Sequence, residues 1–165
     1  MPFPDPTIVL ARAEHLARLE EIRAAAFAPV FASFRAILGD EIYERAQARV
    51  DAAQPELLAS LLEPDSVWEV YVAEHGGVIA GFVSLRLDHD TKAGEIGLNA
   101  VHPDHAGRGI GTAMYDFALS RMREAGMRVA TVATGGDPSH APARRAYEKA
   151  GFDVQIPSVW MCREL

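Results

Sequence analysis

The sequence predicts a single α/β (α+β) domain built on a mixed, mostly antiparallel central sheet, with one parallel crossover pair and helices on both faces. Two observations carry this prediction. Segments rich in β-forming residues flank Gly76-Gly77, which predicts an antiparallel hairpin. From Glu95 onward, strand and helix patterns alternate, which predicts a crossover between parallel strands. The 165 residues are enough to bury one hydrophobic core.

The first third of the chain is predicted to be mostly helical, because its apolar residues recur at helical spacing. The expected elements are a strand over 7–11, two helices within 14–38 divided by Pro29, a helix over 41–52, and a short helix that starts near Pro55 and ends before Pro64. We expect this region, residues 1–66, to lie as a lid or a wall over the sheet.

The remaining residues supply the sheet and its crossover helices. The expected elements are strands over 67–74, 78–87 and 95–101, a helix from Ile110 to a C-terminal cap at Gly126, a strand over 128–134, a helix over 142–150, and closing strands over 154–156 and 159–164. Strict alternation along 95–101 would place Glu95 and Asn99 on the same face.

Composition excludes several classes of protein. No apolar run approaches the roughly 20 residues that span a bilayer, and the start of the chain lacks the features of a secretory signal. The only cysteine, Cys162, rules out an internal disulfide and is read as an apolar filler. We therefore expect a cytoplasmic protein without a membrane partner. The net charge of -7 argues against a nucleic-acid partner.

Charge is distributed unevenly within this acidic chain. Residues 100–150 carry 7 basic against 5 acidic side chains, whereas residues 1–99 carry 8 against 16. The basic stretch fits either solvated helix faces or a site for a polyanionic ligand. Four acidic residues of the first part are candidates to face a cationic substrate: Glu41, Glu44, Asp88 and Asp90.

A glycine-rich segment, Gly107-Arg108-Gly109-Ile110-Gly111-Thr112, follows a predicted strand and opens a predicted helix. Such a segment is either a tight turn or a cradle in which backbone N–H groups converge on phosphate oxygens, helped by the helix dipole. A P-loop is excluded because no Gly-Lys pair occurs in the chain. A dinucleotide fingerprint is excluded because Thr112 or Met114 occupies the position of its last glycine.

The segment Ala106-Gly107-Arg108-Gly109-Ile110-Gly111 resembles the [RQ]-x-x-G-x-[GA] motif of the GNAT superfamily of N-acetyltransferases. Ala106 stands at the first position, where Arg or Gln is usual. A second motif, roughly N-x-x-A-x-x-x-Y-x-x-x-G-F, is similar to the segment from His140 to Phe152, with His140 where Asn is usual. The resemblance covers residues 67–152, which it identifies as an acetyl-CoA-binding core, and it makes 1–66 the acceptor side.

The resemblance implies acetyl-CoA as the acyl donor and direct transfer to an amine. Backbone amides from Arg108 to Thr112 are expected to hold the pyrophosphate, and the strand from Asn99 to Val101 the pantetheine arm. The implied cofactor-binding residues are Asn99, Ala100, Val101, Ala106, Gly107, Arg108, Gly109, Ile110, Gly111, Thr112, His140, Arg144 and Tyr147. His140 is expected to cap the last helix, touch the cofactor or carry a proton.

The reaction needs a base for the attacking amine and an acid for the departing thiolate. Glu95 matches a position where some family members carry a catalytic glutamate, and Tyr147 matches the family's tyrosine near the thioester sulfur. Alternatively, Glu95 is an exposed strand residue and a water chain serves as the base. The alternative for Tyr147 is a packing residue. His102, Asp104 and His105 are read as an exposed turn, so no metal is expected.

Other functions remain open at this point. A module that senses acetyl-CoA without catalysis and an enzyme that uses another acyl-CoA both fit the same motifs. The acceptor amine, on a small molecule or a peptide, is not readable. A homodimer is a further expectation, since dimers are frequent in this family.

Overall fold

The computed structural model describes residues 5–165; residues 1–4, which carry part of the expectation about a secretory signal, lie outside them. Its sheet has five strands in sequential order, with bounds β1 Thr7–Leu10, β2 Trp68–His75, β3 Val78–Asp88, β4 Ala93–Val101 and β5 Val129–Val132. Neighbours pair antiparallel except β4 and β5, which are parallel. The predicted fold class is confirmed.

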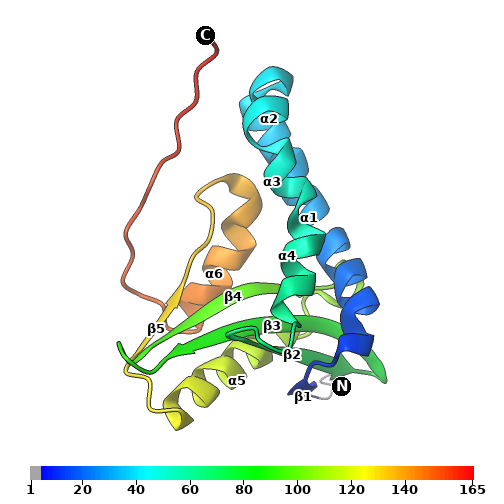
Figure 1. Cartoon of the computed structure of the whole chain (residues 1–165), viewed down its shortest axis with the longest axis vertical. Helices are drawn as coiled ribbons and strands as arrows, with labels where there is room; N and C mark the ends of the chain where they lie inside the picture. Colours follow the sequence, from blue (N-terminus) through cyan, green and yellow to red (C-terminus); the bar gives the residue numbers. More distant parts are fainter. Residues whose placement is uncertain (1–4) are drawn as a thin grey trace.

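Helices cover both faces of the sheet (Figure 1). Their bounds are α1 Leu16–Leu38, α2 Asp40–Ala46, α3 Ala48–Ala52, α4 Gln54–Leu61, α5 Ile110–Glu124 and α6 Ala141–Lys149. In Figure 1, α5 lies beneath the sheet, while α1 and α4 rise above it. Short 3-10 turns precede α1 and α6, at Ala13–His15 and Pro138–His140.

Two buried clusters separate these layers. The first joins α5 and α6 to one face and includes Val83, Leu85, Ile96, Met114, Ala118, Met122 and Tyr147. The second joins α1 and α4 to the other face and includes Leu19, Ile22, Leu58, Val70, Phe82 and Ala100. Most of these side chains are completely buried, so at roughly 25 cal/mol per Å² of apolar area both faces contribute to stability.

The predicted division at Pro29 is wrong, because α1 continues through it to Leu38. Proline removes one helical donor and displaces the carbonyl four residues earlier. Pro29 is exposed, so water can satisfy that carbonyl. The predicted helix over 41–52 is instead two short helices, which are separated at Gln47, where φ is -125°.

A bulge in β4 changes which residues share a face. Gly97 and Leu98 together lie opposite the single residue Ser84, whose hydroxyl donates to the Leu98 carbonyl at 2.9 Å. Ile96 and Asn99 therefore both face the α5 side. The expectation that Glu95 and Asn99 share a face is wrong: Glu95, one residue before Ile96, faces the α1 side.

The parallel pair is short and leaves a splay. β5 pairs with β4 only from Ala93↔Val129 to Ile96↔Val132. Beyond that point β4 continues to Val101 without a β5 partner, while the chain after β5 leaves the sheet for α6. We call this stretch of β4, residues 97–101, which pairs with β3 but not with β5, the splay.

The two predicted closing strands are wrong. Residues 153–165 form no helix or strand, and they run away from the body of the protein beside α6 (Figure 1). A strand requires a neighbouring ladder, and these residues do not reach the free edge of β5. Their side chains are exposed, including Cys162, so the reading of that cysteine as an apolar filler is also wrong.

Within the described residues, no single helix has both the length and the apolarity to cross a membrane. One bent pair passes that test jointly by length and composition, formed by Ala13–Leu38 and Asp40–Ala46 with 119° between them.

Candidate active site

Asn99 links two tyrosines at the splay. Its amide nitrogen donates to the Tyr147 hydroxyl oxygen at 2.9 Å, and its amide oxygen accepts from the Tyr115 hydroxyl at 2.9 Å. The same amide nitrogen also donates to the Gly97 carbonyl at 2.9 Å, which fixes its orientation. Because Asn99 is the donor to Tyr147, the hydroxyl hydrogen of Tyr147 is left to point at another acceptor.

Both tyrosines are buried, Tyr115 on α5 and Tyr147 on α6, with ring centroids 5.0 Å apart. Burial, followed by the neighbouring Tyr147, raises the pKa of Tyr115 above its ordinary value. Tyr115 therefore stays a neutral donor that holds the Asn99 oxygen. Tyr147 also packs against Phe152, at 6.0 Å between centroids, so its ring position is set from both sides.

The glycine segment has the backbone of an anion cradle. Gly107 and Gly109 have φ of 74° and 79°, which side chains other than glycine rarely adopt. A Cβ placed at either would meet nothing within 4 Å beyond its chain neighbours, so the conformation, rather than crowding, requires glycine. The segment is consequently open on the side of these Cβ positions.

Helix α5 starts within this segment, at Ile110. Its first backbone bond runs from the Ala113 N–H to the Gly109 carbonyl at 3.0 Å. The amides of Ile110, Gly111 and Thr112 precede it and have no helical carbonyl to bind. The Ile110 side chain is buried in the core, which anchors the start of the helix, whereas Thr112 is exposed. These amides and the helix dipole together favour an anion here.

His140 and Asp137 form a tight pair in the loop between β5 and α6. His140 Nδ1 lies 2.5 Å from Asp137 Oδ1, and their side chains are 18% and 14% exposed. The other carboxylate oxygen accepts from the Ser139 amide at 3.1 Å and from the Ser33 hydroxyl of α1 at 3.2 Å. The His140 ring also stacks on Phe34 of α1, 5.8 Å away.

This pair decides one of the expectations for His140. Its side chain makes no capping bond at α6, because its Nδ1 is committed to Asp137. Burial raises the pKa of Asp137, but hydrogen bonds from Ser139 and His140 outweigh it and lower that pKa to about 2. A contact of His140 with the cofactor, or a role in proton transfer, stays a prediction.

Arg144 braces the same loop. One guanidinium nitrogen donates to the carbonyls of Gly135 and Asp137, at 2.6 and 2.9 Å. The structure thus gives Arg144 a role in holding the loop, and its predicted contact with coenzyme A stays a prediction.

Glu95 lies on the α1 side of the sheet, beside β3. Its carboxylate accepts from Arg86 at 2.6 Å, and Arg86 in turn lies over the Trp68 ring at 5.3 Å. The Glu95 side chain is 37% exposed, so water reaches it. The candidate base is therefore accessible, positioned by one arginine, and separated from the tyrosines by the sheet.

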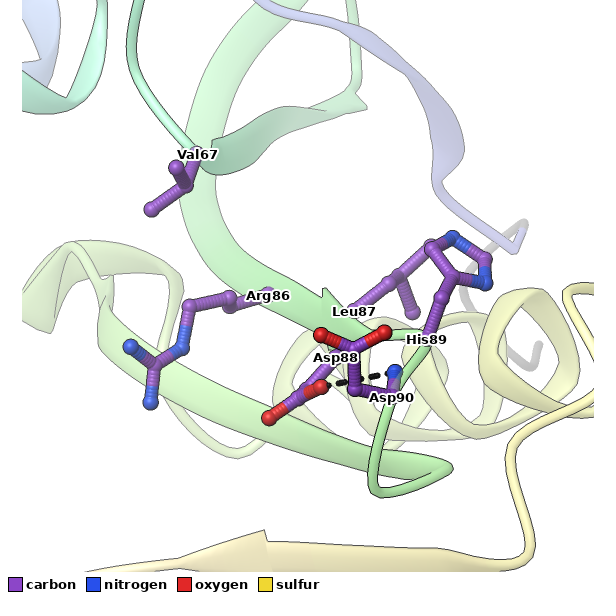
Figure 2. Close-up of a pocket in the computed structure, with 6 residues that line it drawn as sticks. All are labelled: Val67, Arg86, Leu87, Asp88, His89 and Asp90. Carbon is purple, nitrogen blue, oxygen red and sulfur yellow. Dashed lines mark hydrogen bonds between the residues drawn. The ribbon is translucent and has the colours of Figure 1, made fainter.

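A cavity of about 310 Å³ lies where β3 turns into β4, lined by Val67, Arg86, Leu87, Asp88, His89 and Asp90 (Figure 2). This is the start of β4, whereas the glycine segment follows its end. Asp88 and Asp90 face this cavity, and hydrogen bonds from Thr91 and Asp90 lower the pKa of Asp88. The cavity is thus distinct from the expected coenzyme A site and borders the Arg86–Glu95 pair.

The other acidic candidates for an amine site are neutralised locally. Glu41 pairs with Arg45 at 3.1 Å, and Glu44 pairs with Arg35.

Three histidines lie near the glycine segment, with ring centroids of His75 and His102 at 6.3 and 6.1 Å from His105. Burial, followed by Arg108, lowers the pKa of His105. No metal-binding group of three or more ligands occurs among residues 5–165.

The sequence alone does not predict several residues of the site. Tyr115 lies five residues into α5, where an aromatic residue reads as core, and only the fold brings it to Asn99. Asp137 and Ser33 are 104 residues apart, and no local pattern connects them. The spacing of three between Asp137 and His140, next to a helix start, is the one local signal that predicts a pair.

Comparison with known proteins places these features in a family. The family model described as "Acetyltransferase (GNAT) family" matches residues 19–152. A mycothiol acetyltransferase from Sanguibacter keddieii is 32% identical over 160 residues, which cover 87% of this chain and 50% of that protein. The chain thus spans about half the length of this relative.

Solved structures share the fold. The PaiA N-acetyltransferase of Thermoplasma acidophilum, in complex with coenzyme A, has a TM-score of 0.71 at 17% identity, covering 94% of each chain. A GNAT family acetyltransferase of Brucella melitensis, in complex with acetyl-CoA, has a TM-score of 0.63 at 21% identity, covering 90% of this chain and 83% of the other. With the matched motifs, the splay and the glycine segment in place, this chain belongs to the acetyltransferase (GNAT) family.

Proposed function

We propose that this chain transfers an acetyl group from acetyl-CoA directly to an amine of a small molecule or peptide. The observation that carries the proposal is the course of β4, which runs from the splay beside Asn99 and Tyr147 into the glycine segment at the start of α5. An elongated ligand with a thioester at one end and a diphosphate further along matches this course.

Binding of acetyl-CoA follows from the backbone. The free amides at the start of α5 provide donors for the diphosphate, with the helix dipole adding to the attraction. The backbone of Asn99 to Val101 has no strand partner on its β5 side, where it provides donors and acceptors for the amide groups of the pantetheine arm, which lies there as an added strand. His140 and Arg144 shape the loop on the other side of the splay.

The chemistry requires two proton movements. The neutral amine attacks the thioester carbonyl carbon, a C–N bond forms, and the C–S bond breaks with its electron pair going to sulfur. Glu95, directly or through water, takes the proton that the amine loses. Tyr147 gives its hydroxyl proton to the thiolate, and solvent restores it. No bond to the protein forms during transfer.

The bulge in β4 supports separate positions for acid and base. Tyr147 approaches the splay from the α5 side, whereas Glu95 lies on the α1 side. An amine arriving from the α1 side would meet the base there, while the thiolate leaves toward Tyr147. Helices α1 and α4 pack over that side of the sheet, which supports the assignment of the N-terminal region as the acceptor region.

A free-thiol assay with acetyl-CoA and a panel of amines tests the function. We expect thiol release that depends on one class of amine, with acetylated product confirmed by mass spectrometry. Acetyl-CoA binding without thiol release across the panel would identify a non-catalytic sensor instead. Faster release from another acyl-CoA, measured in the same assay, would change the donor and leave the mechanism intact.

The setting of the enzyme is part of the proposal. We infer a cytoplasmic homodimer that acts on acetyl-CoA and an amine, without a nucleic-acid or membrane partner. The net charge of -7 and the single cysteine support this setting. The amine acceptor is supported by the family, and a small-molecule amine by the mycothiol acetyltransferase relative.

A further inference from the structure

An amine that reaches the site from water carries one proton more than the neutral amine that attacks the thioester. With a pKa near 10.4, as for a lysine side chain, roughly one molecule in 2,500 is neutral at pH 7. The nitrogen must therefore lose one proton before it attacks and a second as the amide forms. Glu95 takes the second of these protons, so the first requires another acceptor on the side where the amine arrives.

The loop before α6 holds a histidine and a carboxylate in the arrangement of a general base. Burial raises the pKa of Asp137, but hydrogen bonds from Ser139 and His140 lower it to about 2, so the carboxylate is ionised at neutral pH. An ionised carboxylate only accepts hydrogen bonds, and the hydrogen of the 2.5 Å contact therefore belongs to Nδ1 of His140. The neutral ring then carries its free electron pair on Nε2. None of the described residues makes a hydrogen bond to Nε2.

The fold fixes the orientation of this pair. The backbone closes over it at Gly135, where a Cβ would lie 2.5 Å from His140 Nδ1 and 2.6 Å from Asp137 Oδ1. Arg144 holds the same loop through two backbone carbonyls, and Phe34 of α1 stacks on the His140 ring. Asp137 and Arg144 are thus the charged groups at this loop, while α1 meets the pair with uncharged side chains. A base that is already held in one orientation is suited to proton transfer.

The pair lies on the side from which the amine is proposed to arrive. Ser33 and Phe34 of α1 contact Asp137 and His140, so the loop reaches the helix that covers the amine side. In Figure 1, α6 ends at the sheet and starts higher, toward α1. His140 and Tyr147 are seven residues apart, which is nearly two helical turns and about 10 Å along the axis. Both side chains therefore project toward about the same side of α6, and the amine would lie between them.

We propose that His140, oriented by Asp137, is the base that takes the first proton from the ammonium group of the acceptor; this role rests on the acetyl transfer proposed above. The N–H bond of the ammonium breaks, its electron pair stays on the amine nitrogen, and the proton binds Nε2. The adjacent carboxylate stabilises the imidazolium that forms. The imidazolium then gives the proton to water, which returns His140 to its neutral form. Glu95 keeps its role in removing the second proton.

The first test uses His140→Asn and the amine that gives the fastest thiol release in the panel. Asn is the usual residue at this position of the family motif, so the variant is expected to fold. We expect kcat/KM for the amine to fall about a hundredfold at pH 7, while calorimetry shows an unchanged affinity for acetyl-CoA. The loss should shrink as the pH rises toward 10, because the amine then loses its first proton to water. A loss that stays constant over this range would indicate a structural role and overturn the proposal.

Two further variants separate the pair from general effects of substitution. Asp137→Asn keeps the imidazole and removes the carboxylate, so kcat/KM should fall by less than in His140→Asn and recover in the same way at high pH. His15→Asn removes an imidazole at the opposite end of α1, where the ring contacts Arg12, and should leave the rate unchanged at every pH. Weaker acetyl-CoA binding in His140→Asn with an unchanged amine rate would assign His140 to the cofactor and contradict the proposal.

The orientation of His140 can also be measured without turnover. Nitrogen NMR of the isotope-labelled chain, with the signals assigned through His140→Asn, should show Nδ1 protonated and Nε2 bare once the ring is neutral. The opposite tautomer would overturn the proposal. Absence of thiol release from the wild-type chain with every amine would refute the transfer and the role of His140 together. Release that is unaffected by His140→Asn would refute the role of His140 alone.

Discussion

Replacing Tyr147 by Phe separates proton donation from packing, because it removes one oxygen and keeps the ring. That oxygen accepts a hydrogen bond from Asn99, whose amide keeps its second acceptor at the Gly97 carbonyl. We therefore expect a loss of about 1 kcal/mol in the free energy of unfolding. For a chain of this length, the midpoint of thermal unfolding falls by about 2–4 °C.

The expected loss of activity is larger than the loss of stability. A positioned acid contributes about 10²- to 10⁴-fold to the rate. A hundredfold fall in kcat corresponds to about 2.7 kcal/mol in the transition state, well above the cost of one hydrogen bond. KM for acetyl-CoA should stay nearly constant, since the ring and the backbone of the splay are unchanged. Steady-state thiol release provides both constants.

Tyr115→Phe is the matched control. It removes the other hydroxyl on the same asparagine, at the same 2.9 Å and in the same buried cluster. Its cost in stability should match that of Tyr147→Phe, because one buried hydrogen bond is lost in each case. Its kcat should fall far less, because the Tyr115 hydroxyl is directed at Asn99. Equal losses of kcat in the two variants would refute proton donation by Tyr147 and leave only a role in positioning.

Three further predictions concern the cradle, the base and the pH dependence of stability. Gly109→Ala, at φ 79°, should lower the free energy of unfolding by about 1–2 kcal/mol and weaken acetyl-CoA binding in calorimetry. The control Gly77→Ala, at φ 81° in the β2–β3 turn, should cost the same stability and leave binding unchanged. An equal loss of affinity in the two variants would disprove the cradle. Glu95→Gln should lower kcat and flatten its acidic pH limb, and an unaltered pH–rate profile would remove Glu95 as the base. Because the pKa of Asp137 is lowered from 3.8 to about 2, its carboxylate stabilises the fold above pH 4, and about 2 kcal/mol is lost as the pH falls toward 2. Asp137→Asn should lack this loss in denaturant titrations between pH 5 and 2, and a parallel curve for wild type and variant would contradict it.

The sequence was informative wherever a local pattern determines the outcome. Alternation and the Gly76-Gly77 turn place β2 and β3 to within about a residue at each end, and glycine spacing locates the start of α5. The position of Tyr147 relative to β4 follows from the second motif together with the crossover. These features depend on short-range sterics and hydrogen bonding, which the sequence encodes residue by residue.

Prediction failed where a residue's partner lies far away in the sequence. Pro29 reads as a helix break, but exposure of that turn lets water satisfy the displaced carbonyl, and exposure is a property of the fold. Residues 154–164 have the composition of strands, yet composition cannot say which edge will pair with them. Asp137 reads as a loop acid until α1 brings Ser33 and Phe34 against the same loop.

The bulge in β4 connects these successes and failures to the chemistry. A regular strand would have placed Glu95 and Asn99 on one face, with acid and base on the same side of the sheet. One extra residue opposite Ser84 places Glu95 and Asn99 on opposite faces instead. Gly97 permits this bulge, because a Cβ at position 97 would lie 2.4 Å from the Trp68 ring and 2.8 Å from the Ser84 hydroxyl. Gly97→Ala would therefore move Trp68, and with it the Arg86 that holds Glu95, as well as the backbone that orients Asn99. A single glycine thus controls the geometry of both proton-transferring groups, although neither its type nor its position in the strand marks it as part of the site.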